Sequence, residues 1–305
     1  MELLQLQYFQ VVARLEHMTD AARSLHVTQS SLSKTIQRLE EDLGVPLFDR
    51  SGRSLRLNQF GRTFLHRVER ALFELEQGRQ EISDLSSPES GSVELAVNTA
   101  GMLPEILRKF RGKQPHVHFH VQMSTTDEMR TLLRRGEVDF CLSSPPVRGD
   151  DIECQVMLLD SILVAVPKGH RLSDGSSIAV TELKDEWFVG LKRGYSTRDI
   201  TDRICQSVGF TPKHVYEGDE PARLRSLVEA DIGLAFVPES STWGSTEGNV
   251  QYLRIEHRDF VREIGLSWHR RRYLSRTALE FREIATDYFN RLPHRQVHST
   301  SSAIY

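Results

Sequence analysis

The 305-residue sequence lacks the features that mark a membrane protein or a secreted one. No apolar stretch approaches the length that spans a bilayer. The first residues form an amphipathic segment instead of a cationic region followed by an apolar run, so no signal peptide is expected. Cysteine is scarce, and Cys141, Cys154 and Cys205 show no short pairing pattern, which favours reduced thiols in a cytoplasm. The apolar run VDFCLSS predicts that Cys141 is a core residue and not a redox sensor.

Catalytic motifs and a strong charge imbalance are also missing. The sequence contains no G-x-S-x-G, G-x-x-x-x-G-K-[ST], H-E-x-x-H or G-x-G-x-x-G motif. His170 and Asp174 lie in a polar turn that offers no nucleophile. We therefore predict a protein that is not an enzyme and needs no cofactor. The formal net charge of −3 means that any surface for nucleic acid must be local.

Residues 19–43 predict two short helices joined by a tight corner. Thr19 and Thr28 are the expected caps of the first and second helix. The apolar residues of the second helix recur at spacings of four, three and four and form one buried stripe: Leu32, Ile36, Leu39 and Leu43. Its opposite face carries hydrogen-bonding side chains and two cations, with no acid between Thr28 and Arg38. Such a face suits the base edges and phosphates of a DNA major groove. An amphipathic hairpin with a solvated polar face is the alternative.

The next residues favour the DNA-binding interpretation. The segment VPLFDRSGRSLRLN reads as two short strands around a turn at Ser51 and Gly52, which makes a wing. Arginine in such a turn contacts phosphates or the minor groove. The predicted DNA-binding residues are Thr28, Gln29, Ser30, Ser31, Ser33, Lys34, Gln37, Arg38, Arg50 and Arg53.

The first sixty residues carry a family resemblance. The L-x-x-F opening helix, the AA-x-x-L-H-V-T-Q-S-S-L-S core, the I-x-x-L-E-x-x-L-G-x-x-L-F-x-R run and the following G-x-x-F resemble LysR-type transcriptional regulators. Many members have proline after the glutamine, where this chain has Ser30 and Ser31, so altered contacts are expected there. The resemblance implies promoter DNA as partner, a homodimer or a tetramer built as a dimer of dimers, and RNA polymerase as a further candidate partner.

Residues 59–85 predict one long helix with an apolar stripe. The stripe consists of Phe60, Phe64, Val68, Leu72, Leu75, Ile82 and Leu85. A long helix of this kind can be buried against a copy of itself, or it can pack on its own carboxy-terminal domain. The resemblance favours a dimerising linker. The polar segment SSPESGS then marks a domain boundary.

The remainder alternates strands and helices, which predicts parallel sheets covered by helices. The runs G-E-V-D-F, V-P-K-G-H-R-L and G-L-A-F-V-P resemble the family's effector domain, which has the two-lobed α/β fold of periplasmic solute-binding proteins. The predicted domains are therefore a winged helix-turn-helix (1–58), a linker helix (59–86) and an effector-binding domain (91–292). Its first lobe comprises 91–161 and 268–292, and its second lobe comprises 162–267. The polar tail 293–305 is expected to be disordered.

Hydroxyl-bearing loops follow most of the predicted strands. Ligands of two-lobed sheets bind where such loops meet, and helix starts there suit a small anion such as a carboxylate or an amino acid. The predicted effector-binding residues are Thr99, Ala100, Gly101, Ser124, Thr125, Thr126, Ser143 and Ser144 in the first lobe, and Tyr195, Ser196, Thr197, Arg198, Gly218, Asp219 and Glu220 in the second. Arg198 is the expected counter-charge, although serines and threonines at these places also serve as simple helix caps.

Three histidines alternate along one predicted strand. His116, His118 and His120 would leave one strand face at a spacing that zinc could use. A solvated strand face is the more common origin of this pattern, so we predict no metal. Three functions remain: a ligand-responsive DNA-binding regulator, a solute-binding protein, and an enzyme on a two-lobed fold. Binding to specific duplex DNA separates the first from the other two.

Overall fold

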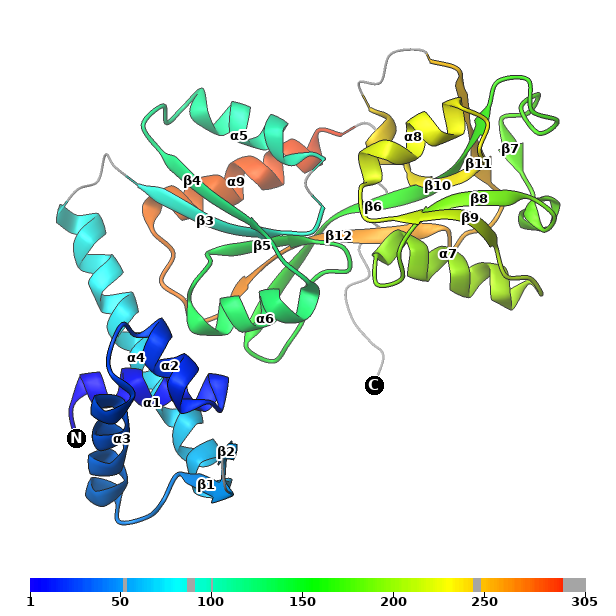
Figure 1. Cartoon of the computed structure of the whole chain (residues 1–305). Coiled ribbons are helices and arrows are strands. Elements are labelled where there is room, and N and C mark those ends of the chain that lie inside the picture. The colour runs from blue at the N-terminus through cyan, green and yellow to red at the C-terminus, as the bar shows by residue number, and fades with distance from the viewer. Residues whose placement is uncertain (52–53, 87–90, 100, 244–247, 293–305) are drawn as a thin grey trace. The chain divides into compact units, whose positions relative to one another are not determined.

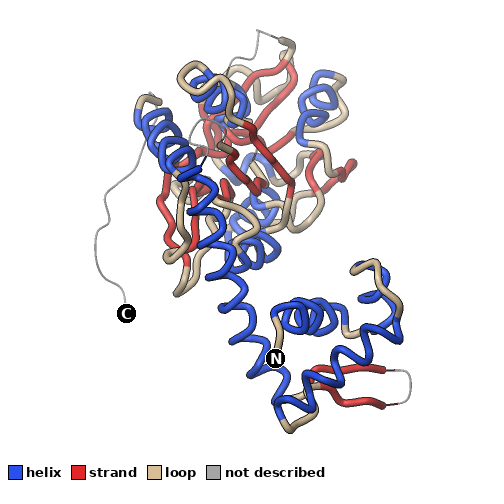
Figure 2. The backbone as a smooth tube through the Cα atoms, turned by 90° about the vertical axis from the view of Figure 1, so that its left-hand side faces the viewer, coloured by secondary structure: helices blue, strands red, loops and turns tan. Residues whose placement is uncertain are grey.

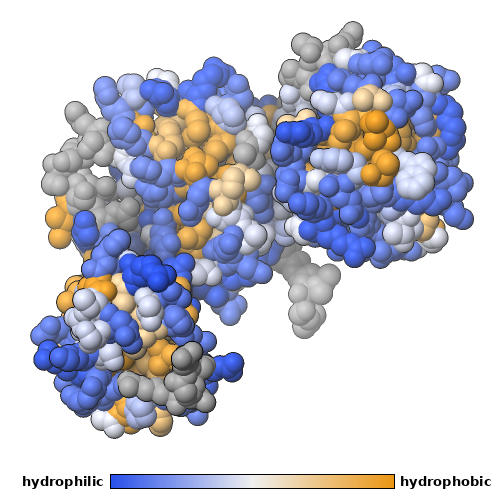
Figure 3. Space-filling model, viewed as in Figure 1, coloured by the Kyte–Doolittle hydropathy of each residue, from blue (hydrophilic) through white to orange (hydrophobic). Residues whose placement is uncertain are grey.

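The computed structural model describes residues 1–51, 54–86, 91–99, 101–243 and 248–292. The chain divides into two compact units, Met1–Ser87 and Pro88–Tyr305. Within the described part, no helix is long and apolar enough to cross a bilayer. Hydrophilic side chains cover most of the molecular face shown in Figure 3. The predicted tail 293–305 lies outside the described residues.

The amino-terminal unit is a winged helix-turn-helix with a long following helix (Figure 1). Its elements are α1 (Leu3–Leu15), α2 (Met18–Ser24), α3 (Gln29–Leu43), β1 (Phe48–Ser51), β2 (Ser54–Leu57) and α4 (Gln59–Ser86). The two wing strands pair antiparallel and lie side by side in Figure 2. One expected cap was wrong: α2 is capped by His17, whose side chain accepts from the N–H of Asp20, and Thr19 lies inside the helix.

The core of this unit is built by the predicted stripe of α3 and by α1. Leu32, Ile36 and Leu39 are fully buried and pack with Phe9 and Val12. Helices α1 and α4 each contact this core over only part of their length. Leu3 of α1 is exposed. On α4 the stripe splits: Phe64, Val68 and Leu72 pack on this core, whereas the other described members, Phe60, Leu75 and Ile82, are exposed.

In the first lobe of the carboxy-terminal unit, three parallel strands lie between helices, as the alternating pattern predicted. It contains β3 (Ser92–Val97), α5 (Leu103–Arg111), β4 (His118–Met123), α6 (Thr126–Arg135), β5 (Phe140–Ser143) and α9 (Arg276–Asn290). β3 pairs parallel with β4 on one side and with β5 on the other. Phe110, Phe140 and Phe281 fill the core between this sheet and helices α5 and α9.

The second lobe has mixed strand pairing, so the predicted parallel sheet was wrong here. It contains β7 (Ser177–Ile178), η1 (Val180–Leu183), β8 (Trp187–Leu191), α7 (Ser196–Ser207), β9 (Lys213–Gly218), α8 (Pro221–Glu229), β10 (Ala235–Pro238), η2 (Glu239–Thr242) and β11 (Val250–Ile255). β10 and β11 both pair antiparallel with the long strand that enters from the first lobe. Two hydrogen bonds of 2.8 Å between the backbones at Trp187, Val189 and Leu234 connect β8 to the start of β10. Phe188 and Phe236 stack in its core.

Two long antiparallel strands, β6 (Ile152–Pro167) and β12 (Val261–His269), run through the junction of the lobes. β6 pairs with β12 over Ile152 to Ser161 and with β10 and β11 beyond it. The predicted return to the first lobe at residue 268 was too late. Gly265 already pairs with Ser143 of β5, and Ile264 and Leu266 lie in the core of the first lobe. The chain therefore re-enters that lobe within the first residues of β12.

Candidate nucleic-acid interface and inter-lobe site

Helix α3 presents one polar face to solvent. Thr28 caps the helix by accepting from the N–H of Ser31 at 3.2 Å, and Gly44 ends it in the left-handed region with φ of +70°. The exposed residues are Thr28, Gln29, Ser30, Ser31, Lys34, Gln37 and Arg38, and Ser33 is half-buried. Gln37 donates to Glu41 at 2.9 Å, so this one amide is partly engaged. The remaining face is a continuous set of donors and acceptors beside one lysine and one arginine.

The wing follows α3 directly. Arg56 of β2 is exposed and lies opposite Asp49 in the strand register. Arg50 belongs to β1, but its side chain lies outside the description, as does Arg53 altogether. A reading helix and an arginine-bearing wing in one small unit form the arrangement that places a helix in a major groove and a hairpin on the adjoining backbone.

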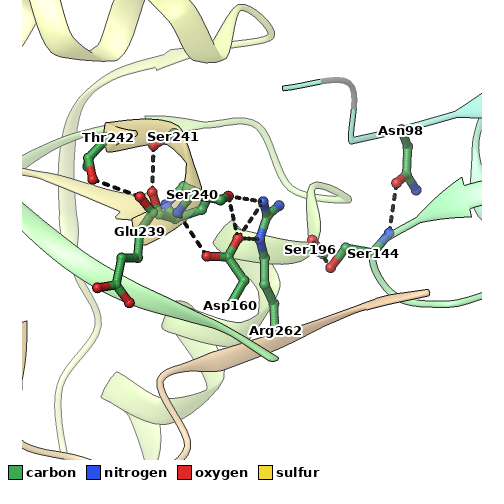
Figure 4. A network of polar contacts seen from close by, with 10 residues as sticks. Asn98, Ser144, Asp160, Ser196, Glu239, Ser240, Ser241, Thr242 and Arg262 are labelled. Atoms are coloured by element: carbon green, nitrogen blue, oxygen red, sulfur yellow. Dashed lines mark hydrogen bonds and ion pairs between the residues drawn. The ribbon is translucent and has the colours of Figure 1, made fainter. Parts of the chain in front are cut away.

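Four polar side chains connect loops of the two lobes, and we call them the inter-lobe site: Asn98, Thr126, Ser144 and Ser196. Asn98 follows β3; its Oδ1 accepts from the Ser144 N–H at 2.9 Å, and its Nδ2 lies 3.5 Å from Thr126 Oγ1. Ser196, the first residue of α7, donates to Ser144 Oγ across the junction at 3.3 Å (Figure 4). The carboxyl ends of β3 and β5, the start of α6 and the start of α7 therefore meet here.

The other predicted effector residues differ in accessibility. Thr99, Ser143 and Thr197 are buried, Gly101 is exposed, and Ser124 is half-buried. Ser143 Oγ is fully buried without a hydrogen-bond partner in the described structure. Thr125 is committed to a capping box, because its hydroxyl and N–H both contact Glu128. Ala100 lies outside the described residues.

In the second lobe, three of the predicted residues form a smaller cluster. Lys192 Nζ lies 3.0 Å from Asp219 Oδ2, and the Tyr195 hydroxyl donates to the Asp219 carbonyl at 3.0 Å. Gly218 is buried, and its carbonyl accepts from the Lys192 N–H. Glu220 is exposed and forms an ion pair with Arg223, three residues later on α8.

Comparisons with known proteins agree with both halves of this arrangement. Residues 3–62 match the family described as bacterial regulatory helix-turn-helix protein, lysR family, and residues 86–290 match the LysR substrate binding domain. The chain belongs to the LysR-type transcriptional regulators. The regulator YybE of Bacillus subtilis, itself uncharacterised, is 34% identical over 293 residues, which are 95% of this chain and 100% of that protein.

Solved structures of low identity support the same fold. A full-length OxyR variant from Pseudomonas aeruginosa aligns over 99% of both chains with a TM-score of 0.69 at 21% identity. Full-length CbnR in complex with its target DNA covers 95% of this chain and 100% of its own, with a TM-score of 0.56 at 23% identity. The described architecture, a winged helix-turn-helix followed by a two-lobed α/β domain, is therefore that of full-length LysR-type regulators.

Arg198, the predicted counter-charge in this LysR-type regulator, already has partners within the second lobe. Its Nε donates to Asp202 at 2.7 Å, and its Nη1 contacts the Leu191 carbonyl at 2.8 Å and Glu217 at 2.6 Å. Although burial by itself disfavours the charge, the hydrogen bonds to these carboxylates raise the pKa of Arg198. The guanidinium lines a small pocket inside the second lobe with His214, so two acids already balance its charge.

Sequence reasoning missed a buried polar cluster at the crossing strands. Arg262 Nε lies 2.9 Å from Asp160 Oδ2, while Asp160 accepts from the N–H and the hydroxyl of Ser240 at 2.9 and 2.6 Å (Figure 4). Asp160 and Arg262 face one another in the register of β6 and β12, and Ser240 comes from η2. The partners are 80 and 102 residues apart in sequence, so no local pattern could have paired them.

The three alternating histidines and the cysteines can be compared with their predictions. His116 precedes β4, His118 and His120 are exposed on it, and no group of three metal-binding side chains occurs among the described residues. All three cysteines are free. Burial raises the pKa of both Cys141 and Cys205 to about 12. These two thiols stay protonated at neutral pH and are poor nucleophiles, which agrees with the prediction that Cys141 is a core residue.

Proposed function

We propose that this LysR-type regulator binds specific promoter DNA through the exposed face of α3, with Gln29, Ser33 and Lys34 contacting base edges. The observation that carries the proposal is the division of α3: one face is fully buried in the unit core, while the polar face is open to solvent. Arg50, Arg53 and Arg56 of the wing would contact phosphate or the minor groove. The DNA-bound structure of CbnR, a protein of the same fold, supports this arrangement.

The bound form would be an oligomer. Three apolar side chains of α4 are unusually exposed in the single chain: Phe60 at 56%, Leu75 at 57% and Ile82 at 69%. Burying them against a second α4 would remove this apolar surface from water, and a twofold dimer would match a dyad-symmetric site. A dimer of dimers, with RNA polymerase as a further contact and the bacterial cytoplasm as location, completes the proposal.

Selection from a random-sequence duplex library tests this function. The purified full-length protein is expected to enrich a motif with dyad symmetry, whereas a solute-binding protein or an enzyme would enrich none. Lys34→Ala should then weaken binding to the enriched duplex by about 1–3 kcal/mol and relax the preference at one base position. Arg56→Ala should weaken binding to all duplexes similarly and reduce the salt slope by about one. Unchanged affinity of both variants would mean that another face binds DNA.

We further propose that a small metabolite with a carboxylate binds at the inter-lobe site and controls the regulator. Helix α7 begins there without a side-chain cap, so its first N–H groups can receive an anion. Ser144 and Ser196 add hydroxyls from opposite lobes. A ligand that contacts both lobes binds one lobe arrangement better than another, and this difference in affinity is the physical basis of control.

Calorimetry with a panel of carboxylic acids and amino acids tests the proposed ligand class. The double variant Ser144→Ala, Ser196→Ala should lose at least one hydrogen bond to a bound carboxylate and weaken its binding roughly tenfold. Thr131→Ala is the matched control, because this exposed hydroxyl donates to the Asp127 carbonyl within α6 and takes no part in the contacts of the inter-lobe site. Equal affinity of both variants would place the ligand elsewhere.

A further inference from the structure

The wing is attached to the rest of its unit by side chains that contact its backbone at the base, where β1 begins and β2 ends. A two-stranded hairpin is marginally stable by itself, so something must set the direction in which it projects. Apolar packing supplies part of this: Leu47, Phe48 and Leu57 at the wing base are buried, and the Phe48 ring packs edge-on against Phe9. Apolar contacts are not directional, so they fix the base more than the projection of the hairpin.

Two carboxylates supply directional contacts at the wing base, beside those that Asn58 Nδ2 makes to the Pro46 carbonyl at 2.9 Å and Arg62 Nη1 makes to the Leu57 carbonyl at 2.6 Å. Glu40, in the last turn of α3, accepts from the N–H of Leu47 at 2.7 Å and from the N–H of Phe48 at 3.3 Å. Glu16 accepts from the N–H of Leu57 at 2.8 Å, at the end of the other strand. Phe48 and Leu57 are paired across the wing. The two acids therefore hold both strands of the hairpin at the same rung.

The backbone around Glu16 also favours this contact. Glu16 is the residue that ends α1, and it lies in the left-handed region with φ of 45°, which is uncommon for a non-glycine residue. Its N–H still bonds the Val12 carbonyl at 2.9 Å, so the position is tied to the helix end. The side chain of Glu16 is thereby placed beside Leu57 of β2, which comes forty-one residues later in the sequence.

The charge of these two acids would by itself oppose DNA binding, so their presence calls for another role. A carboxylate close to a DNA-binding face repels phosphates, and Glu40 lies on the reading helix itself. We propose that Glu16 and Glu40 are positioning residues for DNA binding, which hold the two wing strands so that the basic hairpin meets DNA beside α3. This inference rests on the proposed function and assigns these two acids a role in it.

The test compares two substitutions that remove the same charge. If Glu40 acted on DNA only through its charge, Glu40→Ala and Glu40→Gln would both tighten binding. A positioning role predicts a split: Glu40→Gln retains an acceptor oxygen and binds like wild type, whereas Glu40→Ala binds about tenfold more weakly, the loss of one well-placed contact. The same split is expected for Glu16→Gln and Glu16→Ala.

The probe is the duplex that the wild-type protein enriches from the random library, measured at several salt concentrations. Glu40→Ala should lower the salt slope by about one for each phosphate contact that the wing loses. Adding Arg56→Ala to Glu40→Ala should then cost less than Arg56→Ala costs alone. Asp42→Ala is the matched control: this acid also lies on α3 but pairs with the terminal amine of Met1, and its loss should not weaken binding.

Hydrogen exchange of the wing backbone gives a second measurement that needs no DNA. The amides of Leu47, Phe48 and Leu57 should exchange faster in the alanine variants, while the amides of α3 remain protected. Equal affinity and equal salt slope for Glu40→Ala and Glu40→Gln, with wild-type DNA binding intact, would overturn the inference and leave the proposed function standing. Failure of the wild-type protein to enrich any duplex would remove the function itself.

Discussion

The buried pair between Asp160 and Arg262 allows a quantitative prediction about the junction of the lobes. Both Arg262 Nε and Arg262 Nη2 lie 2.9 Å from Asp160 Oδ2, and the side chains are only 11% and 1% exposed for arginine and aspartate. Arg262→Met removes the guanidinium and leaves a buried carboxylate whose described partners are the two donors of Ser240. Breaking a buried pair from one side costs about 3–5 kcal/mol, because the remaining charge is uncompensated.

Thermal unfolding of the full-length regulator measures this cost. For a domain of this size each kcal/mol shifts Tm by about 2–4 °C, so Arg262→Met should lower Tm by roughly 6–20 °C. Glu263→Ala is the matched control, since the next residue on β12 pairs with Arg148 at 2.8 Å with side chains 47% and 61% exposed. Exposed pairs contribute about 0–1 kcal/mol, so its Tm should fall by less than about 4 °C. Equal, small shifts for both variants would refute the reasoning, because they would show that water already solvates the buried pair.

Three further predictions concern other parts of the chain. Gly61→Ala should destabilise the amino-terminal unit by about 1–3 kcal/mol, because the Cβ of the new alanine would lie 2.2 Å from the Leu47 carbonyl oxygen. Gly78→Ala should be neutral or stabilising, because nothing lies within 4 Å of the Cβ added there. Chemical denaturation measures the free energy of unfolding of both variants. Burial lowers the pKa of His214, so the stability that neutral His214 contributes is complete above its ordinary pKa of about 6.5 and falls as the pH drops below that value. His214→Gln should therefore flatten the plot of Tm against pH. Parallel plots for the wild-type protein and the variant would contradict this. Burial raises the pKa of Cys205 to about 12, so iodoacetamide at pH 7.5 should modify Cys205 far more slowly in the native protein than in urea. Mass spectrometry of the peptide that contains Cys205 measures both rates, and equal rates would contradict the prediction.

Local sequence patterns predicted an element correctly where the residues of that element by themselves determine its conformation. The apolar spacing of α3 predicted which face is buried, and Thr28 caps the start of that helix as expected. By contrast, Thr19 looked like a cap, but His17 has the extended backbone that a cap requires, and that conformation is not visible in a residue pattern.

Pairing over long distances is what local patterns left open. The first half of β6 and all of β11 were not predicted, because their polar and apolar residues become strand-like only when a partner strand lies beside them. The effector residues were chosen from loops, and the structure brings Ser144 and Ser196 together while it occupies Thr125 with its own capping box. Arg198 had the right position in sequence for a ligand contact, yet Asp202 and Glu217 neutralise it.

The sequence by itself determined the class of the protein, because helix caps, apolar periods and the spacing of the helix-turn-helix residues act within a few turns of chain. Only the tertiary structure decided which charges are available, since an ion pair such as Asp160–Arg262 or a support such as Glu16 on the Leu57 N–H joins residues that the fold brings together from far apart. The physical reason is one of range. Backbone conformation is chosen locally, whereas the free energy of a charge depends on everything that surrounds it after folding.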